Sequence, residues 1–325
     1  MLAVALRRVI EGAFVMVAMS IAVFVGVNVI GNPVDMLIAA DCAQECRRLA
    51  IERLGLDRPV WEQYVVFLGN LLNGDLGRSF VFGTPSLQLI LERMPATLEL
   101  ALSAMIIAIV IGVPLGMWAG MHPRSISARS VMAGSILGFS VPTFWVGLLL
   151  IMLFAVELRL LPTTGRGATV AVLGVPVSLL TADGLAHIAL PALNLAIYKI
   201  SLVIRLTRAG TREALVSEYV KFARAKGLHP RRVVFVHVLK NILIPVVTIV
   251  GLELGSVIAF AVVTETIFAW PGMGKLIIES IKVLDRPVIV AYLMITVVIF
   301  VALNLIVDLT YALLDPRVRI DSRRV

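Results

Sequence analysis

The residues of this chain that could act chemically are a few polar side chains within long apolar runs. Glu253 lies near the middle of such a run, close to Ser256, and Glu265 lies further along the same run. An ionised side chain is costly in an apolar run and normally faces the protein interior or a water-filled cavity. These three side chains could therefore line a polar pathway through the apolar region. The alternative is a structural role, with the Glu253 carboxylate neutral or paired with a partner subunit.

The sequence contains none of the short motifs that bind nucleotide phosphates or carry out metal-dependent or nucleophilic hydrolysis. It has no Gly-x-x-x-x-Gly-Lys-Ser/Thr run, no His-Glu-x-x-His motif and no Gly-x-Ser-x-Gly motif. The four histidines lie in distant segments, which argues against a metal catalyst. We therefore expect no catalytic residue, no metal site and no cofactor in this chain.

Composition excludes a soluble domain. Hydrophobic residues make up 59% of the 325 residues, and the mean hydropathy is +0.98. Charged residues make up only 15%, against about 25% in soluble proteins. The net charge of +8 is divided among short segments between apolar runs instead of forming one basic surface, so we expect no nucleic-acid partner.

Six apolar runs are long enough to cross a membrane. They cover approximately residues 9–30, 97–120, 130–156, 187–205, 242–268 and 288–314. The sequence thus predicts an all-α polytopic membrane protein with six transmembrane helices, the third kinked at Pro142. The first run is longer than the core of a signal peptide and no clear cleavage site follows, so residues 1–30 are expected to remain as the first transmembrane helix.

The distribution of charge predicts an orientation. Lys and Arg are more frequent in the segments that would lie inside, where ten of them, from Lys199 to Lys240, are assigned to the largest inner segment. This bias places both termini in the cytoplasm. Residues 31–96 are slightly acidic and are expected to form an external amphipathic segment. Its Cys42 and Cys46 are predicted to be unpaired, because a four-residue spacing orients the side chains poorly for a disulfide, although an oxidising compartment would permit one. Trp270 is expected to anchor at the outer membrane interface.

Residues 219–245 form the one long basic segment of the chain, and their charge places them on the cytoplasmic side. Tyr219, Phe222 and Lys226 fall along one stripe of a short helix. Ala223 and Ala225 are small, which would let another surface approach the backbone closely.

The residues that follow predict how this short helix ends. Gly227 fits the left-handed position that ends a helix, and Leu228 is placed for the hydrophobic contact that accompanies such an end. Pro230 suits the first turn of the next helix. The pattern predicts a short helix, a sharp turn and a second amphipathic helix that leads into the membrane, an arrangement suited to docking a partner.

These residues resemble a known family. The run at residues 223–228, followed by His237, Asn241 and Pro245, is similar to the coupling loop of ABC-importer permease subunits, and in particular of the B-type permeases of the dipeptide, oligopeptide and nickel group. The general pattern of ABC importers has Glu-Ala-Ala before the glycine, where this chain has Lys-Phe-Ala; the peptide permeases commonly have a basic residue there. Further segments that resemble the B-type permeases lie at residues 54–64, 74–79, 93–100 and 264–274.

The resemblance implies a type I ABC importer permease fold in the bacterial cytoplasmic (inner) membrane. It implies a five-helix core at residues 97–325 with a cytoplasmic coupling loop at about 206–240. The partners it implies are a C-type permease subunit in a heterodimer, two ABC ATPase subunits that bind ATP and Mg, an external substrate-binding protein and the lipid membrane. The residues implied to contact the ATPase are Tyr219, Phe222, Ala223, Arg224, Ala225, Lys226, Gly227 and Leu228.

The implied activity is import of di- or oligopeptides by alternating access, driven by closure of the ATPase subunits against the coupling loop. A cationic group that meets Glu253 would then be a peptide amino terminus. Two alternatives stay open. Within the family the cargo could be nickel or another metal chelate, and from another class the chain could be a stand-alone secondary transporter or channel.

Overall fold

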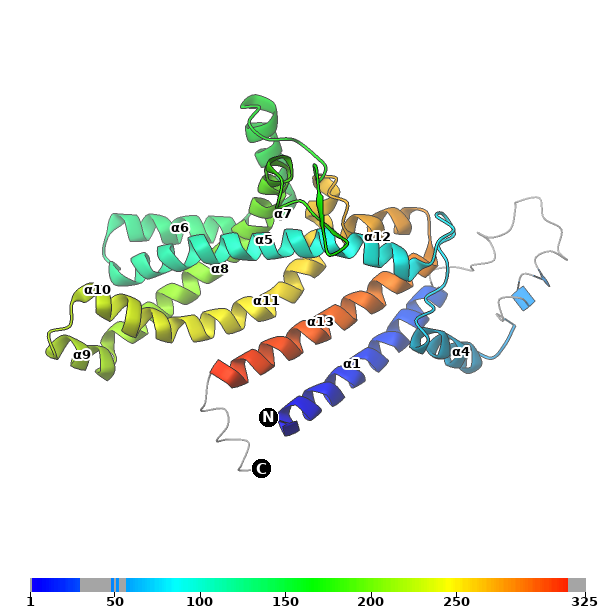
Figure 1. Cartoon of the computed structure of the whole chain (residues 1–325), viewed down its shortest axis with the longest axis horizontal. Coiled ribbons are helices and arrows are strands. Elements are labelled where there is room, and N and C mark those ends of the chain that lie inside the picture. The colour runs from blue at the N-terminus through cyan, green and yellow to red at the C-terminus, as the bar shows by residue number, and fades with distance from the viewer. Residues whose placement is uncertain (1, 30–47, 50, 53–56, 315–325) are drawn as a thin grey trace. The chain divides into compact units, whose positions relative to one another are not determined.

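The computed structural model of the chain (Figure 1) describes residues 2–29, 48–49, 51–52 and 57–314. Cys42 and Cys46 lie outside these residues, as does most of the first half of the predicted external segment. The described chain is helical apart from one hairpin, which agrees with the predicted all-α class. Its helices are α1 (Leu2–Val29), α4 (Val60–Leu72), α5 (Ser86–Met121), α6 (Ile126–Ser140), α7 (Thr143–Leu150), α8 (Ala182–Val216), α9 (Glu218–Ala225), α10 (Pro230–Arg232), α11 (Leu239–Ile267), α12 (Met273–Lys282) and α13 (Arg286–Leu314), with π-helical segments η1 (Ile151–Glu157) and η2 (Val233–Val238).

Five of these helices are long and apolar enough to cross a membrane, and a sixth candidate is a bent pair. The pair is α6 with α7 and η1, and it turns by 107° at its break. Pro142 stands at the break, as predicted, and Val141 before it is extended, with ψ 132°. A residue before proline is driven out of the helical region by the proline ring, so the predicted kink is a true interruption of the helix.

The described chain divides into two compact units. One contains residues 95–275 and the end of α13, and the other contains residues 2–94 together with residues 276–302. Helices α5, α12 and α13 contribute to both units.

In the first unit, α8 packs against α6, α7 and α11. It also lies against α5, where three glycines spaced four residues apart face it: Gly112, Gly116 and Gly120. A Cβ atom at Gly116 would come within 2.7 Å of both the Ile204 carbonyl oxygen and the Thr207 Cβ. Such small residues let membrane helices approach each other closely, so these glycines set the distance between α5 and α8.

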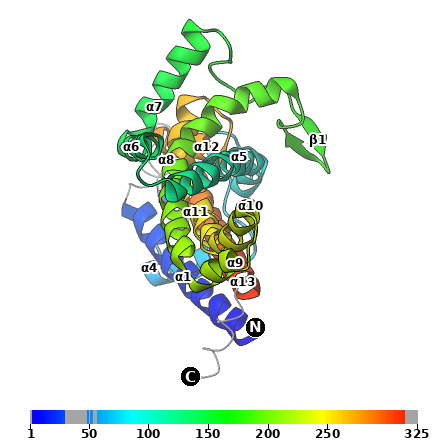
Figure 2. The same cartoon turned by 90° about the vertical axis from the view of Figure 1, so that its left-hand side faces the viewer.

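A two-stranded hairpin in the first unit lies between η1 and α8, in the interval that separates the third and fourth predicted apolar runs. Strands β1 (Val170–Val172) and β2 (Val175–Val177) pair antiparallel, and Figure 2 shows them projecting away from α6. The turn residues Leu173 and Gly174 both have positive φ, 50° and 82°, as the tightest hairpin turns require.

Glu99 of α5 holds the base of this hairpin. Its carboxylate accepts hydrogen bonds from Arg166 at 2.6 Å and from the backbone N–H groups of Ser178 and Leu179 at 2.7 and 2.9 Å. A buried carboxylate with a cation and two N–H donors is well compensated, so the hairpin base is fixed to α5.

In the second unit, the described part of the external segment packs on apolar helices. Tyr64 of α4 hydrogen-bonds Ser20 of α1 at 2.8 Å and makes an edge contact with Phe24. Asp285, just before α13, is fully buried, bonds the Ser79 hydroxyl and accepts the Phe80 N–H at 3.1 Å. These contacts stabilise residues 60–85.

The close approach of α5 to α8 makes a prediction. Gly116→Ala should lower the free energy of unfolding by about 1–3 kcal/mol, because the new methyl group meets backbone as well as side-chain atoms. Gly134→Ala in α6 is the matched control, since a Cβ there meets nothing within 4 Å. Titration of the purified protein from mild detergent into dodecyl sulfate measures both. Equal stabilities for the two variants would contradict the assigned packing.

Candidate functional site

Helix α9 follows directly after the end of α8 in the chain. Ser217 ends α8 and precedes α9, with extended backbone at φ −68° and ψ 153°, and its hydroxyl donates to the Ala214 carbonyl at 2.5 Å. Glu218 in the first turn pairs with Lys221 at 2.7 Å. The chain therefore turns sharply over one residue, and α9 keeps a fixed direction relative to α8.

The end of α9 has the predicted geometry. Gly227 has φ +71°, the left-handed conformation. The Leu228 N–H donates to the Ala223 carbonyl at 3.3 Å, and the Gly227 N–H donates to the Arg224 carbonyl at 2.9 Å. This pair of bonds is the Schellman motif, which satisfies carbonyl groups that a helix end leaves free.

The next helix begins at once and continues into the membrane. The His229 ring accepts a hydrogen bond from the Arg231 N–H at 3.3 Å, and Pro230 occupies the first turn, as predicted. From Pro230 to Ile267 the chain is one candidate span of 38 residues. A displacement of the turn at Gly227 thus acts on a continuous helix.

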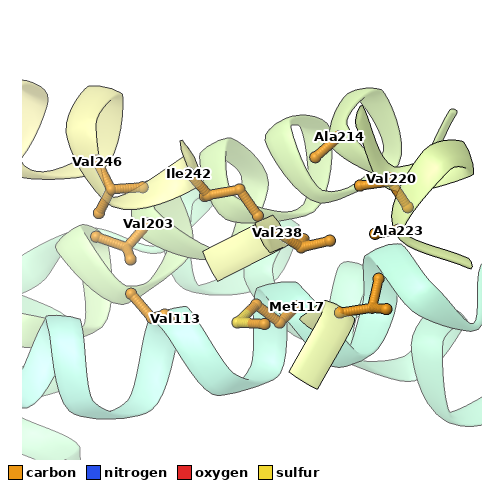
Figure 3. Packing of buried hydrophobic residues seen from close by; sticks show 10 residues of the cluster. Val113, Met117, Val203, Ala214, Val220, Ala223, Val238, Ile242 and Val246 are labelled. Atoms are coloured by element: carbon orange, nitrogen blue, oxygen red, sulfur yellow. The ribbon is translucent and has the colours of Figure 1, made fainter. Parts of the chain in front are cut away.

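The inner face of α9 is buried in the chain's own core. Val220 and Ala223 are 0% and 3% exposed and pack with residues of α5, α8, η2 and α11, and Leu228 packs against the same cluster. Ala223 was predicted to admit another surface, and that surface belongs to this chain. Figure 3 labels nine of the ten members of this cluster: Val113, Met117, Val203, Ala214, Val220, Ala223, Val238, Ile242 and Val246.

The outer face of α9 is aromatic and basic. Tyr219 and Phe222 are 42% and 61% exposed, and the Lys226 ammonium lies 4.5 Å from the centre of the Phe222 ring. Arg224 and Ala225 are also exposed. We call Tyr219, Phe222, Arg224, Ala225 and Lys226 the outer face of α9. Large exposed aromatics beside cations are typical of surfaces that bind proteins.

Glu253 and Ser256, two of the three residues predicted to line a polar pathway, form one cluster with Lys199 of α8. The Lys199 ammonium bonds the Glu253 carboxylate and the Ser256 hydroxyl, the latter at 2.7 Å. Ser256 also donates to Glu253 at 2.8 Å. The side chains of Lys199 and Glu253 are 9% and 31% exposed, so the glutamate side chain is partly exposed and the lysine side chain is nearly buried.

Glu265, the third residue predicted to line the pathway, does not belong to this cluster and is fully buried. Its carboxylate accepts hydrogen bonds from the Thr97 hydroxyl at 2.7 Å and from the Lys275 N–H at 2.9 Å. The Thr97 hydroxyl accepts from the Met273 N–H at 2.8 Å. Glu265 and Thr97 therefore cap the first turn of α12, and in this conformation the carboxylate faces packed protein.

Trp270 is likewise buried, and the prediction of an interfacial anchor was wrong. It is 0% exposed and its indole N–H donates to the Ala96 carbonyl at 2.9 Å. An indole in the core needs such a partner for its N–H. The segment at 264–274 is thus a packed junction between α5, α11 and α12.

Among the described residues, no group of three or more His, Cys, Asp or Glu side chains could hold a metal ion. The polar clusters of the chain are ion pairs and helix caps. What the arrangement offers is an exposed helix, α9, joined to two long apolar helices, α8 and α11.

The model of binding-protein-dependent transport system inner membrane components matches residues 112–320, and the model of the N-terminal part of the same components matches residues 1–101. The chain belongs to this family of ABC-importer permeases. It is 39% identical over 302 residues to a di/tripeptide transport system permease, DppB, of Pseudomonas aeruginosa, covering 89% of this chain and 90% of that protein. It is 36% identical over 306 residues to the dipeptide permease DppB of Escherichia coli, with the same shares covered.

Two further comparisons extend over most of the permease. The oligopeptide permease AppB of Bacillus subtilis is 38% identical over 310 residues, covering 92% of this chain and 96% of that protein. A solved structure, the inward-facing MetNI methionine ABC transporter, superposes with a TM-score of 0.52 at 16% identity, covering 70% of this permease and 97% of that chain. At that identity the likeness concerns the fold alone, and it agrees with the predicted type I permease fold.

Family membership gives this chain its place in a transport system. It is a multi-pass inner membrane component that works with a substrate-binding protein and with partner subunits that hydrolyse ATP. The permease itself is not an enzyme.

Lys199 is the residue that sequence reasoning misplaced. The sequence predicted it among the cations of the inner loop, but it lies in the middle of α8 and faces Glu253 of α11. The available signal was a lone lysine and a lone glutamate, each within a different apolar run. A charge in such a run normally finds an opposite charge.

This pair predicts a specific pattern of stability. Lys199→Met should destabilise the permease, because it leaves Glu253 without its cation. The loss should be less than the about 3–5 kcal/mol of a fully buried pair, since Glu253 is partly exposed. The double variant Lys199→Met/Glu253→Gln should recover most of the loss, and Lys240→Met, at an exposed lysine, should change little. Thermal unfolding in detergent compares these variants and the single variant Glu253→Gln with the wild type, and additive losses of the two single variants in the double variant would refute the pairing.

Proposed function

We propose that this chain is the permease subunit of an ATP-driven importer that moves di- or oligopeptides into the cell by alternating access. The observation that carries the proposal is the 36–39% identity, over most of the chain, to proteins that are named dipeptide, di/tripeptide and oligopeptide permeases. The described exposed helix joined to two long membrane helices suits such a machine.

The coupling element of this proposal is α9 with its terminal turn, residues 219–228. Its outer face docks on an ATPase subunit, and its inner face, through Val220 and Ala223, rests on the cores of α8 and α11. ATP and Mg bind to two partner ATPases. When the ATPases close, they push α9, and the α8 and α11 helices tilt as rigid elements and open the cavity outward.

A second permease of the C type completes the pathway. Burial supports this: 61% of the apolar window of Ala182–Val216 is buried inside the chain, but only 28% of the window of Pro230–Ile267. The exposed side of α11 thus offers apolar surface to a partner subunit or to lipid. An external substrate-binding protein delivers the cargo to the heterodimer.

Glu253 and Ser256 are the pathway candidates that the geometry favours. The exposed part of the Glu253 carboxylate would receive a peptide amino terminus in exchange for part of its contact with Lys199. Glu265, buried as a cap of α12, has its carboxylate occupied in this conformation. Normal transport by a Glu253→Gln variant would remove Glu253 from the pathway and leave it a structural residue.

The orientation follows from the coupling element. With α9 on the cytoplasmic side, both termini lie in the cytoplasm and residues 31–96 lie outside, after a first transmembrane helix at residues 1–30. The core is then residues 97–325 with the coupling loop at about 206–240. Labelling of single cysteines placed at each terminus with a membrane-impermeant reagent checks this assignment.

ATP hydrolysis by the reconstituted complex tests the function. We expect stimulation by binding protein loaded with peptide. Stimulation by a nickel-loaded or metal-chelate-loaded binding protein alone would keep the mechanism and change the cargo. If no ATPase assembles with the chain, a stand-alone transporter or channel becomes the better explanation.

The outer face of α9 makes a sharper prediction. Phe222→Ser should reduce co-purification of the ATPase at least about tenfold, because truncation of an exposed aromatic anchor typically costs an interface 2 kcal/mol or more. Thermal stability should not change, since Phe222 is 61% exposed. Trp61→Ser in α4 removes an aromatic of similar exposure, 67%, from the proposed outer side and is the matched control.

Substitutions at Gly227 separate the effect of backbone conformation from the effect of side-chain crowding. A Cβ added there meets nothing within 4 Å, so any loss comes from the left-handed backbone. Gly227→Val should therefore impair ATPase coupling strongly, and Gly227→Asn, which tolerates that conformation, much less. Coupled ATP hydrolysis measures both variants. Equal activity of the valine and asparagine variants would show that the turn does not matter.

A further inference from the structure

A basic cavity lies between α6 and α8, at the end of the first unit where α5 turns into α6. It has a volume of about 280 Å³. Arg129 of α6 and Arg208 of α8 line it, together with the apolar side chains of Met132, Ala133 and Ile136. None of its lining residues is acidic.

The two guanidinium groups lack a counter-charge. Neither Arg129 nor Arg208 has an ion pair among the described residues, and the Nε of Arg208 is buried without a hydrogen-bond partner there. Arg205, one turn earlier on α8, lies 4.5 Å from the centre of the Phe139 ring of α6. A partly buried cation with a buried unsatisfied donor is stabilised by an anion.

The cavity lies at the level of the membrane surface. Trp118, in the last turn of α5, is 45% exposed, and its indole N–H donates to the Ser127 hydroxyl of α6 at 3.1 Å. Half-exposed tryptophan at the end of a membrane helix is typical of the interface between lipid and water. The apolar side of the cavity continues along α6 through Ile136 and Leu137, which are 56% and 65% exposed.

We propose that this cavity binds one anionic phospholipid, with its phosphate between Arg129 and Arg208 and an acyl chain along Met132, Ala133 and Ile136. A free phosphate would satisfy the arginines but leave the apolar lining uncovered, and a neutral detergent would do the reverse. Only a ligand with both parts matches the lining. Basic pockets between membrane helices are suited to acidic lipid headgroups.

The experiment compares lipids on the assembled transporter. The complex is reconstituted in nanodiscs that contain phosphatidylglycerol and phosphatidylcholine with identical chains, and native mass spectrometry counts the lipids that stay bound after release. We expect one retained phosphatidylglycerol more than in the variant Arg129→Gln/Arg208→Gln, whose apparent affinity should fall about tenfold or more. Arg124→Gln, an exposed arginine of the same turn that does not line the cavity, is the matched control.

A second variant protects the test against a loss of folding. Ala133→Phe fills the apolar part and keeps both arginines, so it too should lose the retained lipid, while co-purification of the ATPase stays unchanged. An unchanged lipid count in either variant overturns the proposal. The proposal is also overturned if inorganic phosphate stabilises the wild-type complex as much as phosphatidylglycerol does. It is overturned as well if a photoreactive residue at position 136 captures the second permease instead of lipid.

Discussion

The close packing of α5 on α8 at Gly112, Gly116 and Gly120 fixes the position of α8, and the coupling element depends on α8. Because α9 begins one residue after α8 ends, its direction is set within the membrane core and not by a flexible loop. The cluster around Val220 and Ala223 then joins α9 to η2 and α11. In the proposed coupling mechanism, a force on α9 would therefore act on two membrane helices at once, through α8 and through the hydrogen-bonded turn at Gly227.

Two carboxylates of the same helix, α11, show how surroundings decide the role of a charge. Glu265 bonds a hydroxyl and backbone N–H groups that belong to a folded helix end, and those donors cannot leave without unfolding the first turn of α12. Within the described residues, the hydrogen-bond partners of the Glu253 carboxylate are side chains, those of Lys199 and Ser256, which can change rotamer. Its carboxylate is also partly exposed. A carboxylate held by movable donors can exchange its partners during a transport cycle, and one held by backbone cannot.

The sequence was informative wherever a structural feature is local. Hydropathy located the apolar helices, and Gly227, Leu228 and Pro230 determined a helix end and a helix start within a few residues of each other. It failed where a residue depends on a distant partner. Nothing near Trp270 shows that its indole would find the Ala96 carbonyl, and the β1–β2 hairpin is held by Glu99, some 70 residues away in the chain. Lys199 was misplaced because its charge suggested an inner loop, whereas its partner lies on another helix.

Three of the four cations of α8 show how this helix connects the membrane with the proposed coupling element. Lys199 in its middle is neutralised by Glu253, Arg205 further along lies over the Phe139 ring, and Arg208 near its end has neither kind of partner among the described residues. Low dielectric explains the order: the most buried cation needs a carboxylate, whereas one at the membrane surface can use an anion from the lipid. A tilt of α8 changes all three environments together. A lipid bound at Arg208 would therefore act on the same helix that α9 moves, and the membrane's content of acidic lipid would then affect how easily α8 tilts.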